Sequence, residues 1–255
     1  MEPQDALIVA LDVDTGEEAL ALAGELADEV GAFKVGMQLF NSEGPDVVRR
    51  IQELGGRVFV DLKFHDIPNT VAAASRVMAR LGCAMFTLHA AGGSDMLWAA
   101  SQAVRDESAA QGVDEPLILA VTVLTSIGQD QLAREMLIPG ASVEEVAAAW
   151  GRMAQACGIG GVVCSPREIT AVRKACGPEL RIVTPGIRPS WTGGLAADDQ
   201  RRITTPAQAI SLGADYIVVG RPITRARNRL EAAKRIAAEI ADARTAKGAD
   251  QAHEE

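Results

Sequence analysis

Residues 57–81, RVFVDLKFHDIPNTVAAASRVMARL, contain in one stretch the strand, loop and helix from which the fold is predicted. Residues 57–63 contain the apolar run VFV and are predicted to form one of the parallel strands, which as a set are rich in Val, Ile and Leu and show little alternation, as is typical of strands buried on both faces. Pro68 then lies in the first turn of a helix predicted over Pro68–Leu81. The stretch therefore predicts one β-strand followed by one α-helix.

The same alternation recurs along the whole chain. Helices are predicted over 16–30, over 42–54 with Ser42 as the capping residue, over Pro68–Leu81 and over 94–111. Eight strands, each followed by a helical segment, within about 250 residues are typical of an α/β protein with a (β/α)8 TIM barrel. We therefore expect a single barrel domain over residues 1–246 and a polar, disordered tail over 247–255. The predicted strands are 6–13, 32–37, 57–63, 85–90, 117–125, 160–165, 181–186 and 216–220.

An open, doubly wound sheet is the alternative that this alternation also allows. The first strand is not followed by a G-x-G-x-x-G motif, and no interior linker rich in Pro and Gly divides the sequence into two halves. Both observations favour the closed barrel.

The acidic composition argues against a nucleic-acid or membrane-surface partner. The chain of 255 residues has 25 Lys and Arg against 34 Asp and Glu, a formal net charge of −9. Partners that carry phosphate backbones or anionic headgroups need basic patches. The apolar runs are far shorter than the ~20 residues that span a bilayer, and the sequence begins MEPQD without a basic leader. We expect a cytoplasmic protein.

The cysteines and histidines do not suggest a metal site. The cysteines contain no C-x-x-C pair, and the histidine spacing shows no metal triad. We therefore expect reduced thiols and no metal. The residues are Cys83, Cys157, Cys164, Cys176, His65, His89 and His253.

Polar and charged residues close almost every predicted strand. In a TIM barrel the active site lies at the carboxyl ends of the strands, so these residues are candidates for a common site. In chain order they are Asp12, Lys34, Asp61, Lys63, His89, Thr125, Ser126, Ser165, Arg188, Gly220 and Arg221.

Asp61 and Lys63 are the most informative of these candidates. Side chains alternate along a strand, so both are expected to point to the same face. A carboxylate and an ammonium at the mouth of a low-dielectric barrel favour each other's charged forms. Together with Asp12, Lys34 and the loop residue Asp66, they suggest a catalytic charge cluster. A solvated run of charges at a strand end is the alternative.

Two loops that contain glycine and arginine indicate a phosphate site. PGIR at 185–188 and GRPI at 220–223 follow the seventh and eighth strands, whose loops frequently bind phosphate in these barrels. A turn glycine beside a surface arginine is the alternative. The long polar connection 187–202 is expected to be a lid or binding loop. His65 and His89 are expected to be hydrogen-bonded structural residues.

The segment DLKFHDIPNT, residues 61–70, resembles the signature of the orotidine 5'-phosphate decarboxylase family. Further matches follow in the family's order from residue 11 to residue 223. They are LDV at 11–13, FKVG at 33–36, TLHA at 87–90, VTVLTS at 121–126, VTPGIRP at 183–189, DQRR at 199–202 and VGRPI at 219–223.

The resemblance implies decarboxylation of orotidine 5'-phosphate to UMP, the last step of de novo pyrimidine synthesis, without metal or cofactor. It implies that Lys63 donates a proton to C6 and that Asp61 lies beside the substrate carboxylate. Lys34 and Asp12 would complete the charge network and contact the ribose.

The resemblance also implies further binding residues and a homodimer. Asp66 and the residues that follow it, up to Thr70, would come from the partner subunit, so that each active site is shared. The phosphate would be held by Arg221, Gly220 and Gln200 with help from Arg188, and the base would face Thr125 and Ser126. The substrate-binding segment would comprise Asp61, Leu62, Lys63, Phe64, His65, Asp66, Ile67, Pro68, Asn69 and Thr70.

Two other functions remain open. Metal-dependent sugar-phosphate enzymes of the same superfamily, such as 3-keto-gulonate-phosphate decarboxylase or hexulose-phosphate synthase, share a D-x-K-x-x-D core and use magnesium. Their pattern lacks the FHDIPNT continuation and the later DQRR. An inactive phosphate-binding barrel is the other possibility, and the presence of all five charged residues of the predicted cluster argues against it.

Overall fold

The computed structural model describes residues 2–192 and 204–252. Eight parallel strands follow one another in the hydrogen-bonded order β1 to β8, and the order closes on itself. The predicted (β/α)8 barrel is therefore confirmed. The open sheet is wrong, because β8 pairs directly with β1, with Val219 opposite Val9. The strands are β1 (Leu7–Ala10), β2 (Ala32–Gly36), β3 (Val58–Phe64), β4 (Met85–His89), β5 (Leu117–Val121), β6 (Gly161–Val163), β7 (Arg181–Thr184) and β8 (Tyr216–Val219).

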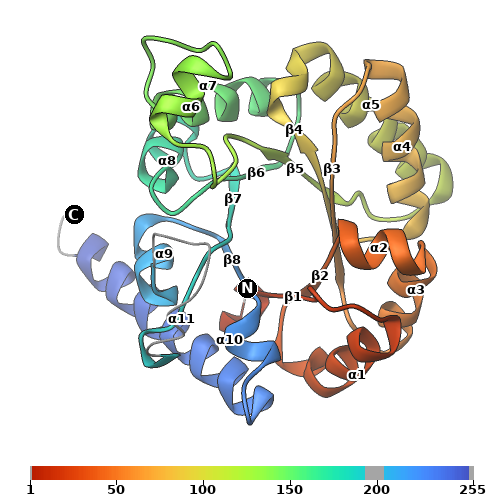
Figure 1. The fold of residues 1–255 in the computed structure, drawn as a ribbon, viewed down its shortest axis with the longest axis vertical. Helices are drawn as coiled ribbons and strands as arrows, with labels where there is room; N and C mark the ends of the chain where they lie inside the picture. Colours follow the sequence, from red (N-terminus) through yellow and green to blue (C-terminus); the bar gives the residue numbers. More distant parts are fainter. Residues whose placement is uncertain (1, 193–203, 253–255) are drawn as a thin grey trace. The chain divides into compact units, whose positions relative to one another are not determined.

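The chain divides into two compact units, of which the first comprises Met1–Val58 and Thr184–Glu255. Its central strand β1 is fully buried and pairs on one side with β2 and on the other with β8. Helices α9 and α11 pack side by side (Figure 1). The helical elements of this unit are η1 (Pro3–Ala6), α1 (Gly16–Leu26), η2 (Ala27–Glu29), α2 (Met37–Glu43), α3 (Asp46–Glu53), η4 (Ser190–Thr192), α9 (Pro206–Leu212), α10 (Arg221–Thr224) and α11 (Arg229–Ala252).

The second unit, Phe59–Val183, contains most of β3 and β7 and all of β4, β5 and β6. Its strands pair in parallel with a nearly regular register, and Thr87 of β4 lies opposite Leu119 of β5. Helices α4 and α5 pack side by side (Figure 1), as do α7 and α8. The helical elements are α4 (Pro68–Leu81), η3 (Ala90–Gly92), α5 (Gly93–Gln111), α6 (Gln129–Arg134), α7 (Val143–Ala156) and α8 (Ile169–Cys176).

The predicted helix over 42–54 with Ser42 as its cap is wrong. Ser42 lies inside α2, where its hydroxyl donates to the carbonyl of Leu39 at 3.1 Å. Gly44, with φ of 70°, ends α2, and Pro45 precedes the first residue of α3. Glycine accepts this positive φ without steric cost, so the first helix ends there and a second one starts after Pro45.

Helix α11 extends to Ala252, into the segment expected to be a disordered tail. Four of the segment's first six residues are good helix formers, namely Lys247, Ala249, Gln251 and Ala252. Residues 253–255 lie outside the described part of the chain. No helix within the described residues is both long and apolar enough to cross a membrane.

Candidate active site

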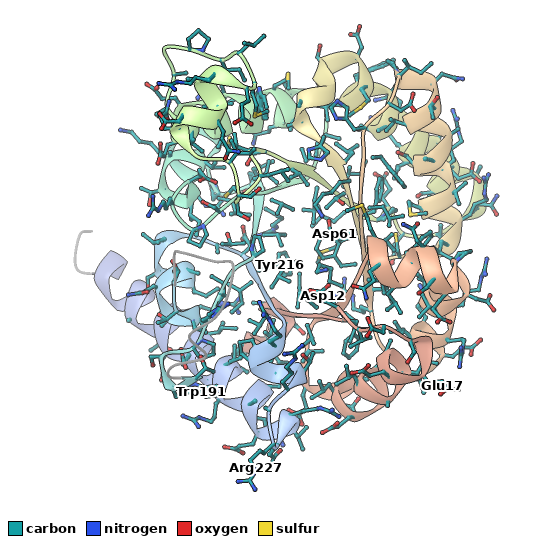
Figure 2. The ribbon with its side chains drawn as sticks, in the orientation of Figure 1. Asp12, Glu17, Asp61, Trp191, Tyr216 and Arg227 are labelled. Atoms are coloured by element: carbon teal, nitrogen blue, oxygen red, sulfur yellow. The ribbon has the colours of Figure 1, made fainter. Side chains whose placement is uncertain are left out.

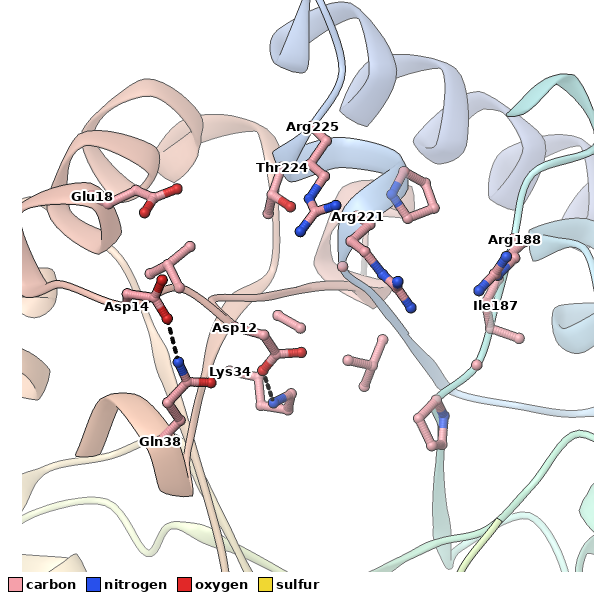
Figure 3. A pocket seen from close by; sticks show the side chains of 17 residues that line it. Asp12, Asp14, Glu18, Lys34, Gln38, Ile187, Arg188, Arg221, Thr224 and Arg225 are labelled. Atoms are coloured by element: carbon pink, nitrogen blue, oxygen red, sulfur yellow. Dashed lines mark hydrogen bonds and ion pairs between the residues drawn. The ribbon is translucent and has the colours of Figure 1, made fainter. Parts of the chain in front are cut away.

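A cavity of about 590 Å³ lies in the first unit, at the carboxyl ends of β1, β2 and β8 and beside the loop after β7. Figure 3 shows carboxylates on one side of the cavity, from the loop after β1 and from α1. Arginines project from the other side, from α10 and from the loop after β7. A cavity with separated acidic and basic walls suits a ligand with an anionic end and a neutral end rich in hydroxyls. The charged lining residues are Asp12, Asp14, Glu18, Lys34, Arg188, Arg221 and Arg225.

Asp12 and Lys34 form an ion pair in this cavity. The Lys34 ammonium donates to Asp12 Oδ1 at 2.9 Å (Figure 3), and the backbone N–H of Leu11 donates to the carbonyl of Lys34 at 3.0 Å. Only 12% of the Lys34 side chain is exposed, whereas Asp12 is 64% exposed. A nearly buried ammonium needs a paired carboxylate. The pair therefore presents Asp12 to the cavity from a fixed position.

Glycine at position 36 leaves room for this ammonium. A Cβ added at Gly36 would lie 3.1 Å from Lys34 Nζ and 3.6 Å from Asp12 Oδ1. The first distance is shorter than ordinary van der Waals contact, so a larger residue would displace the lysine head group. The FKVG motif thus contributes both the Lys34 ammonium and, through Gly36, the space that this ammonium occupies.

The loops after β7 and β8 meet at the same cavity, as the sequence predicted. Arg221 is the first residue of α10 and Gly220 precedes it. Arg188 follows β7, and its backbone N–H donates to the carbonyl of Thr204 at 3.0 Å. Both arginines and Gly220 line the cavity. The predicted phosphate ligand Gln200 lies outside the described residues, as do residues 193–202 of the expected loop.

Asp61 and Lys63 form a second ion pair, in the second unit. The Lys63 ammonium donates to Asp61 Oδ1 at 2.8 Å, and both side chains are largely buried. Strand β3 is irregular here: Val60 pairs with Phe86, and the next pair is Phe64 with Leu88. Between these two pairs β3 contains more residues than β4, so β3 must bulge. Lys63 takes up this excess with φ of 54°, in the left-handed region. The two side chains thus meet through a bulge instead of through regular alternation.

A buried threonine on the neighbouring strand contacts both members of this pair. Thr87 Oγ1 donates to Asp61 Oδ1 at 3.0 Å and accepts from the backbone N–H of Lys63 at 2.9 Å. Thr87 belongs to the TLHA motif, but sequence reasoning assigned no role to it. Its position within a buried strand, opposite a strand that ends in two charges, is the signal that points to it.

His65 and His89 lie near the second ion pair, with ring centroids 5.4 Å apart. Burial lowers the pKa of His89, and electrostatic interaction with His65 and Lys63 lowers it further, while Asp61 acts in the opposite direction. His89 therefore favours the neutral form. The expected role of the two histidines as hydrogen-bonded structural residues stays a prediction.

The segment after β3 is exposed from His65 to Thr70. Asp66 Oδ1 accepts the backbone N–H of Ile67 at 2.6 Å, and Pro68 begins α4. Ile67, a large apolar residue, is 66% exposed. Before the segment, Phe64 packs against Phe86 with ring centroids 5.9 Å apart. Leu62 is half-buried in β3.

Thr125 and Ser126 lie beyond the end of β5, in a turn, and are exposed. The predicted strand over 117–125 is therefore too long, because the ladder ends at Val121. Within residues 2–192 and 204–252, no three His, Cys, Asp or Glu side chains converge so as to hold a metal ion.

Residues 5–236 match the model of the family described as "Orotidine 5'-phosphate decarboxylase / HUMPS family". The chain belongs to this family. A Syntrophomonas wolfei subsp. wolfei protein named orotidine 5'-phosphate decarboxylase is 57% identical over 240 residues, which are 94% of this chain and 99% of that protein. A protein of the same name from Heliobacterium modesticaldum is 53% identical over 95% of this chain and 98% of its own length.

Solved structures of orotidine 5'-phosphate decarboxylases share the fold. The crystal structure of the Lactobacillus acidophilus protein has a TM-score of 0.80 and 37% sequence identity, and the match covers 92% of this chain and 98% of that one. The Pyrococcus horikoshii OT3 protein has a TM-score of 0.69 and 27% identity over 92% of this chain and 98% of its own. The family resemblance inferred from the sequence motifs is thereby confirmed.

In this member of the orotidine 5'-phosphate decarboxylase / HUMPS family, sequence reasoning missed part of the cavity wall. Asp14 accepts from Gln38 Nε2 at 2.6 Å, and Glu18 and Arg225 line the same cavity. Asp14 follows Asp12 at the same two-residue spacing that separates Asp61 from Lys63. Arg225 lies four residues after Arg221, next to the last turn of α10, so helical spacing was the available signal.

Proposed function

We propose that this chain decarboxylates orotidine 5'-phosphate to UMP and CO2 with its own side chains, without a metal or an organic cofactor. Family membership and two relatives that carry the name of this carboxy-lyase over nearly the whole chain support the reaction. The observation that carries the mechanism is the ammonium of Lys63, held 2.8 Å from Asp61 at the carboxyl end of a barrel strand.

The reaction needs a fixed positive charge next to C6. When the bond between C6 and the carboxylate breaks, the electron pair stays on C6, in the plane of the ring, where the π system cannot delocalise it. A preorganised ammonium stabilises this developing charge and then transfers a proton to it. In our proposal Lys63 Nζ supplies that proton, C6 becomes C–H, and the neutral amine regains a proton from solvent.

Asp61 has two roles in the proposal. Its carboxylate fixes the position of the Lys63 ammonium, because the two groups are in hydrogen-bond contact. It also lies beside the substrate carboxylate, where the repulsion between two negative charges is relieved when CO2 leaves.

The cavity of the first unit suits a ribose and a phosphate. Asp12, presented by Lys34, accepts hydrogen bonds from ribose hydroxyls, and Arg221 with Arg188 binds the phosphate through charge-assisted hydrogen bonds. Gly220 and Gln200 complete the phosphate site, and Thr125 and Ser126 face the base. Binding energy from the phosphate contributes to the large barrier reduction that this reaction requires, up to ~23 kcal/mol.

We also propose that the enzyme is a homodimer in which residues 66–70 of each subunit complete the partner's active site. The exposure of this segment, including apolar Ile67, supports the assignment. We place the enzyme in the cytoplasm. The free thiols of Cys83, Cys157, Cys164 and Cys176 fit a reducing compartment.

The deciding experiment follows the ultraviolet absorbance of orotidine 5'-phosphate with the purified protein in the presence of EDTA, with UMP identified as the product. We expect a steady loss of substrate with EDTA present and none with the Lys63→Ala variant. A reaction that stops on chelation, or turnover of sugar phosphates with magnesium instead, would overturn the metal-free mechanism. If the protein turned over neither substrate class, the proposed activity would be rejected, and the chain would be interpreted as a phosphate-binding protein.

A further inference from the structure

Thr87 joins the side chain of Asp61 to the backbone of Lys63. It lies in β4 with no exposed surface, at the position opposite Leu119 of β5. Its hydroxyl stands between the Asp61 carboxylate at 3.0 Å and the Lys63 backbone N–H at 2.9 Å. Because Thr87 is closed to solvent, water cannot readily replace either contact.

The direction of both hydrogen bonds follows from the chemistry of the three groups. A backbone N–H can only donate, so Thr87 Oγ1 accepts from Lys63. The single hydroxyl proton is then directed at the carboxylate, which can only accept. Asp61 Oδ1 therefore accepts two hydrogen bonds, one from the Thr87 hydroxyl and one from the Lys63 ammonium. Thr87 thus closes a ring that runs from the Asp61 side chain to the Lys63 backbone.

This ring lies at the place where β3 departs from regular geometry. Lys63 has φ of 54°, a conformation that L-residues with side chains rarely adopt, within the bulge between Val60 and Phe64. Such a conformation persists where the surrounding structure enforces it. The bond from the Lys63 N–H to Thr87 is a direct restraint on this backbone, and Thr87 is itself held in the paired ladder of β4 and β5.

We propose that Thr87 is a positioning residue for the decarboxylation: it fixes the Lys63 ammonium and the Asp61 carboxylate at the separation and direction that the reaction needs. The role rests on the proposed function of Lys63 and Asp61. Thr87 acts through these two residues and does not itself contact the substrate.

The first test replaces the hydroxyl by a methyl group. Thr87→Val keeps the shape and removes both hydrogen bonds, and we expect kcat to fall by about 100-fold, the effect typical of a misplaced catalytic group. KM for orotidine 5'-phosphate and the dissociation constant of UMP should stay near those of the wild type, because ribose and phosphate are bound by other residues. Thr87→Ser, which retains the hydroxyl, should recover most of kcat.

Thr122→Val is the matched control. Thr122 is also a buried threonine beside a barrel strand, and its hydroxyl donates to the carbonyl of Val163 at 3.0 Å without touching the ion pair. We expect this variant to lose stability but to keep kcat. Equal losses of kcat in Thr122→Val and Thr87→Val would reduce Thr87 to a packing residue and overturn the proposal, as would a wild-type kcat in Thr87→Val.

Amide hydrogen exchange at Lys63 gives a readout that does not depend on turnover. Exchange should be slow in the wild type and in Thr87→Ser and faster in Thr87→Val. If Thr87→Val does not fold, Thr87→Ala takes its place in both measurements. A wild-type protein that is inactive toward orotidine 5'-phosphate would reject the proposed function. Unchanged Lys63 exchange in the variants would reject the role of Thr87 alone.

Discussion

Lys63 Nζ lies 2.8 Å from Asp61 Oδ1, although the two residues belong to one strand and are separated by Leu62 alone. In an extended strand the Cα atoms of such residues are about 6.6 Å apart, and their side chains run parallel. Here the bulge in β3 and the left-handed backbone at Lys63 alter that geometry. The lysine therefore combines an unusual backbone conformation with the proposed proton transfer.

Two substitutions of Lys63 separate these two properties. Lys63→Ala and Lys63→Gly both remove the ammonium, so both should lower kcat by at least about 1000-fold. Glycine adopts φ of 54° without steric cost, whereas alanine, like lysine, pays for its Cβ there, so Lys63→Gly should be more stable than Lys63→Ala by about 1 kcal/mol. Urea denaturation measures the difference. Equal stabilities would show that the backbone at residue 63 relaxes in the variants, and substantial residual turnover in either one would remove Lys63 as the proton donor.

Arg221→Ala tests the phosphate site. We expect kcat/KM for orotidine 5'-phosphate to fall by about 100-fold, since a hydrogen-bonded charge pair is lost, while the activity on the phosphate-free nucleoside changes little. Arg227→Ala is the control, because Arg227 is an exposed arginine at the outer edge of the first unit (Figure 2) and does not line the cavity. If both substrates lost activity equally, Arg221 would have a role other than binding the phosphate.

The fold could be predicted from the sequence because the two strongest signals, apolar strand segments and the residues that begin and end helices, are local. Each predicted strand contains a buried apolar run, and all eight strands are present in the structure, although those predicted over 6–13, 160–165 and 181–186 end earlier, at Ala10, Val163 and Thr184. Helix α4 has the predicted bounds, since Pro68 lies in its first turn and Gly82, with φ of 68°, ends it. Helix α2 was missed because it begins directly at the end of β2, without a loop to mark the boundary.

The candidate site was predictable in composition but not in geometry. Strand-end positions identified Asp12, Lys34, Arg188 and Arg221, which the structure places around one cavity. The bulge that turns Lys63 toward Asp61 depends on the register between β3 and β4, two strands that are separated in the sequence by helix α4. A single sequence carries no signal of this register shift, and the contacts of Thr87 depend on it.

Mixing two inactive variants tests whether the active site is shared. Subunits carrying Asp66→Ala and subunits carrying Lys63→Ala are unfolded together and refolded as a mixture. If residues 66–70 complete the partner's site, each heterodimer regains one intact site, and a statistical mixture should recover about a quarter of the wild-type activity per subunit. Each variant refolded alone is the control. No recovery, with heterodimers demonstrated by mass spectrometry, would place Asp66 in its own subunit's site.

The histidine pair predicts how stability depends on pH. Burial, with the electrostatic interaction of His65 and Lys63, lowers the pKa of His89 from its ordinary value of 6.5 despite the opposing effect of Asp61. Below about pH 6.5 the unfolded chain therefore takes up a proton at this residue more readily than the folded protein does. The contribution of His89 to the free energy of unfolding is constant above that pH and decreases as the pH falls below it.

Thermal unfolding at about pH 7.5 and at about pH 5.5 tests this prediction. The loss of stability on acidification should be smaller for His89→Gln, which cannot titrate, than for the wild type. Parallel curves for the two proteins would mean that His89 is protonated as easily in the folded state as in the unfolded chain.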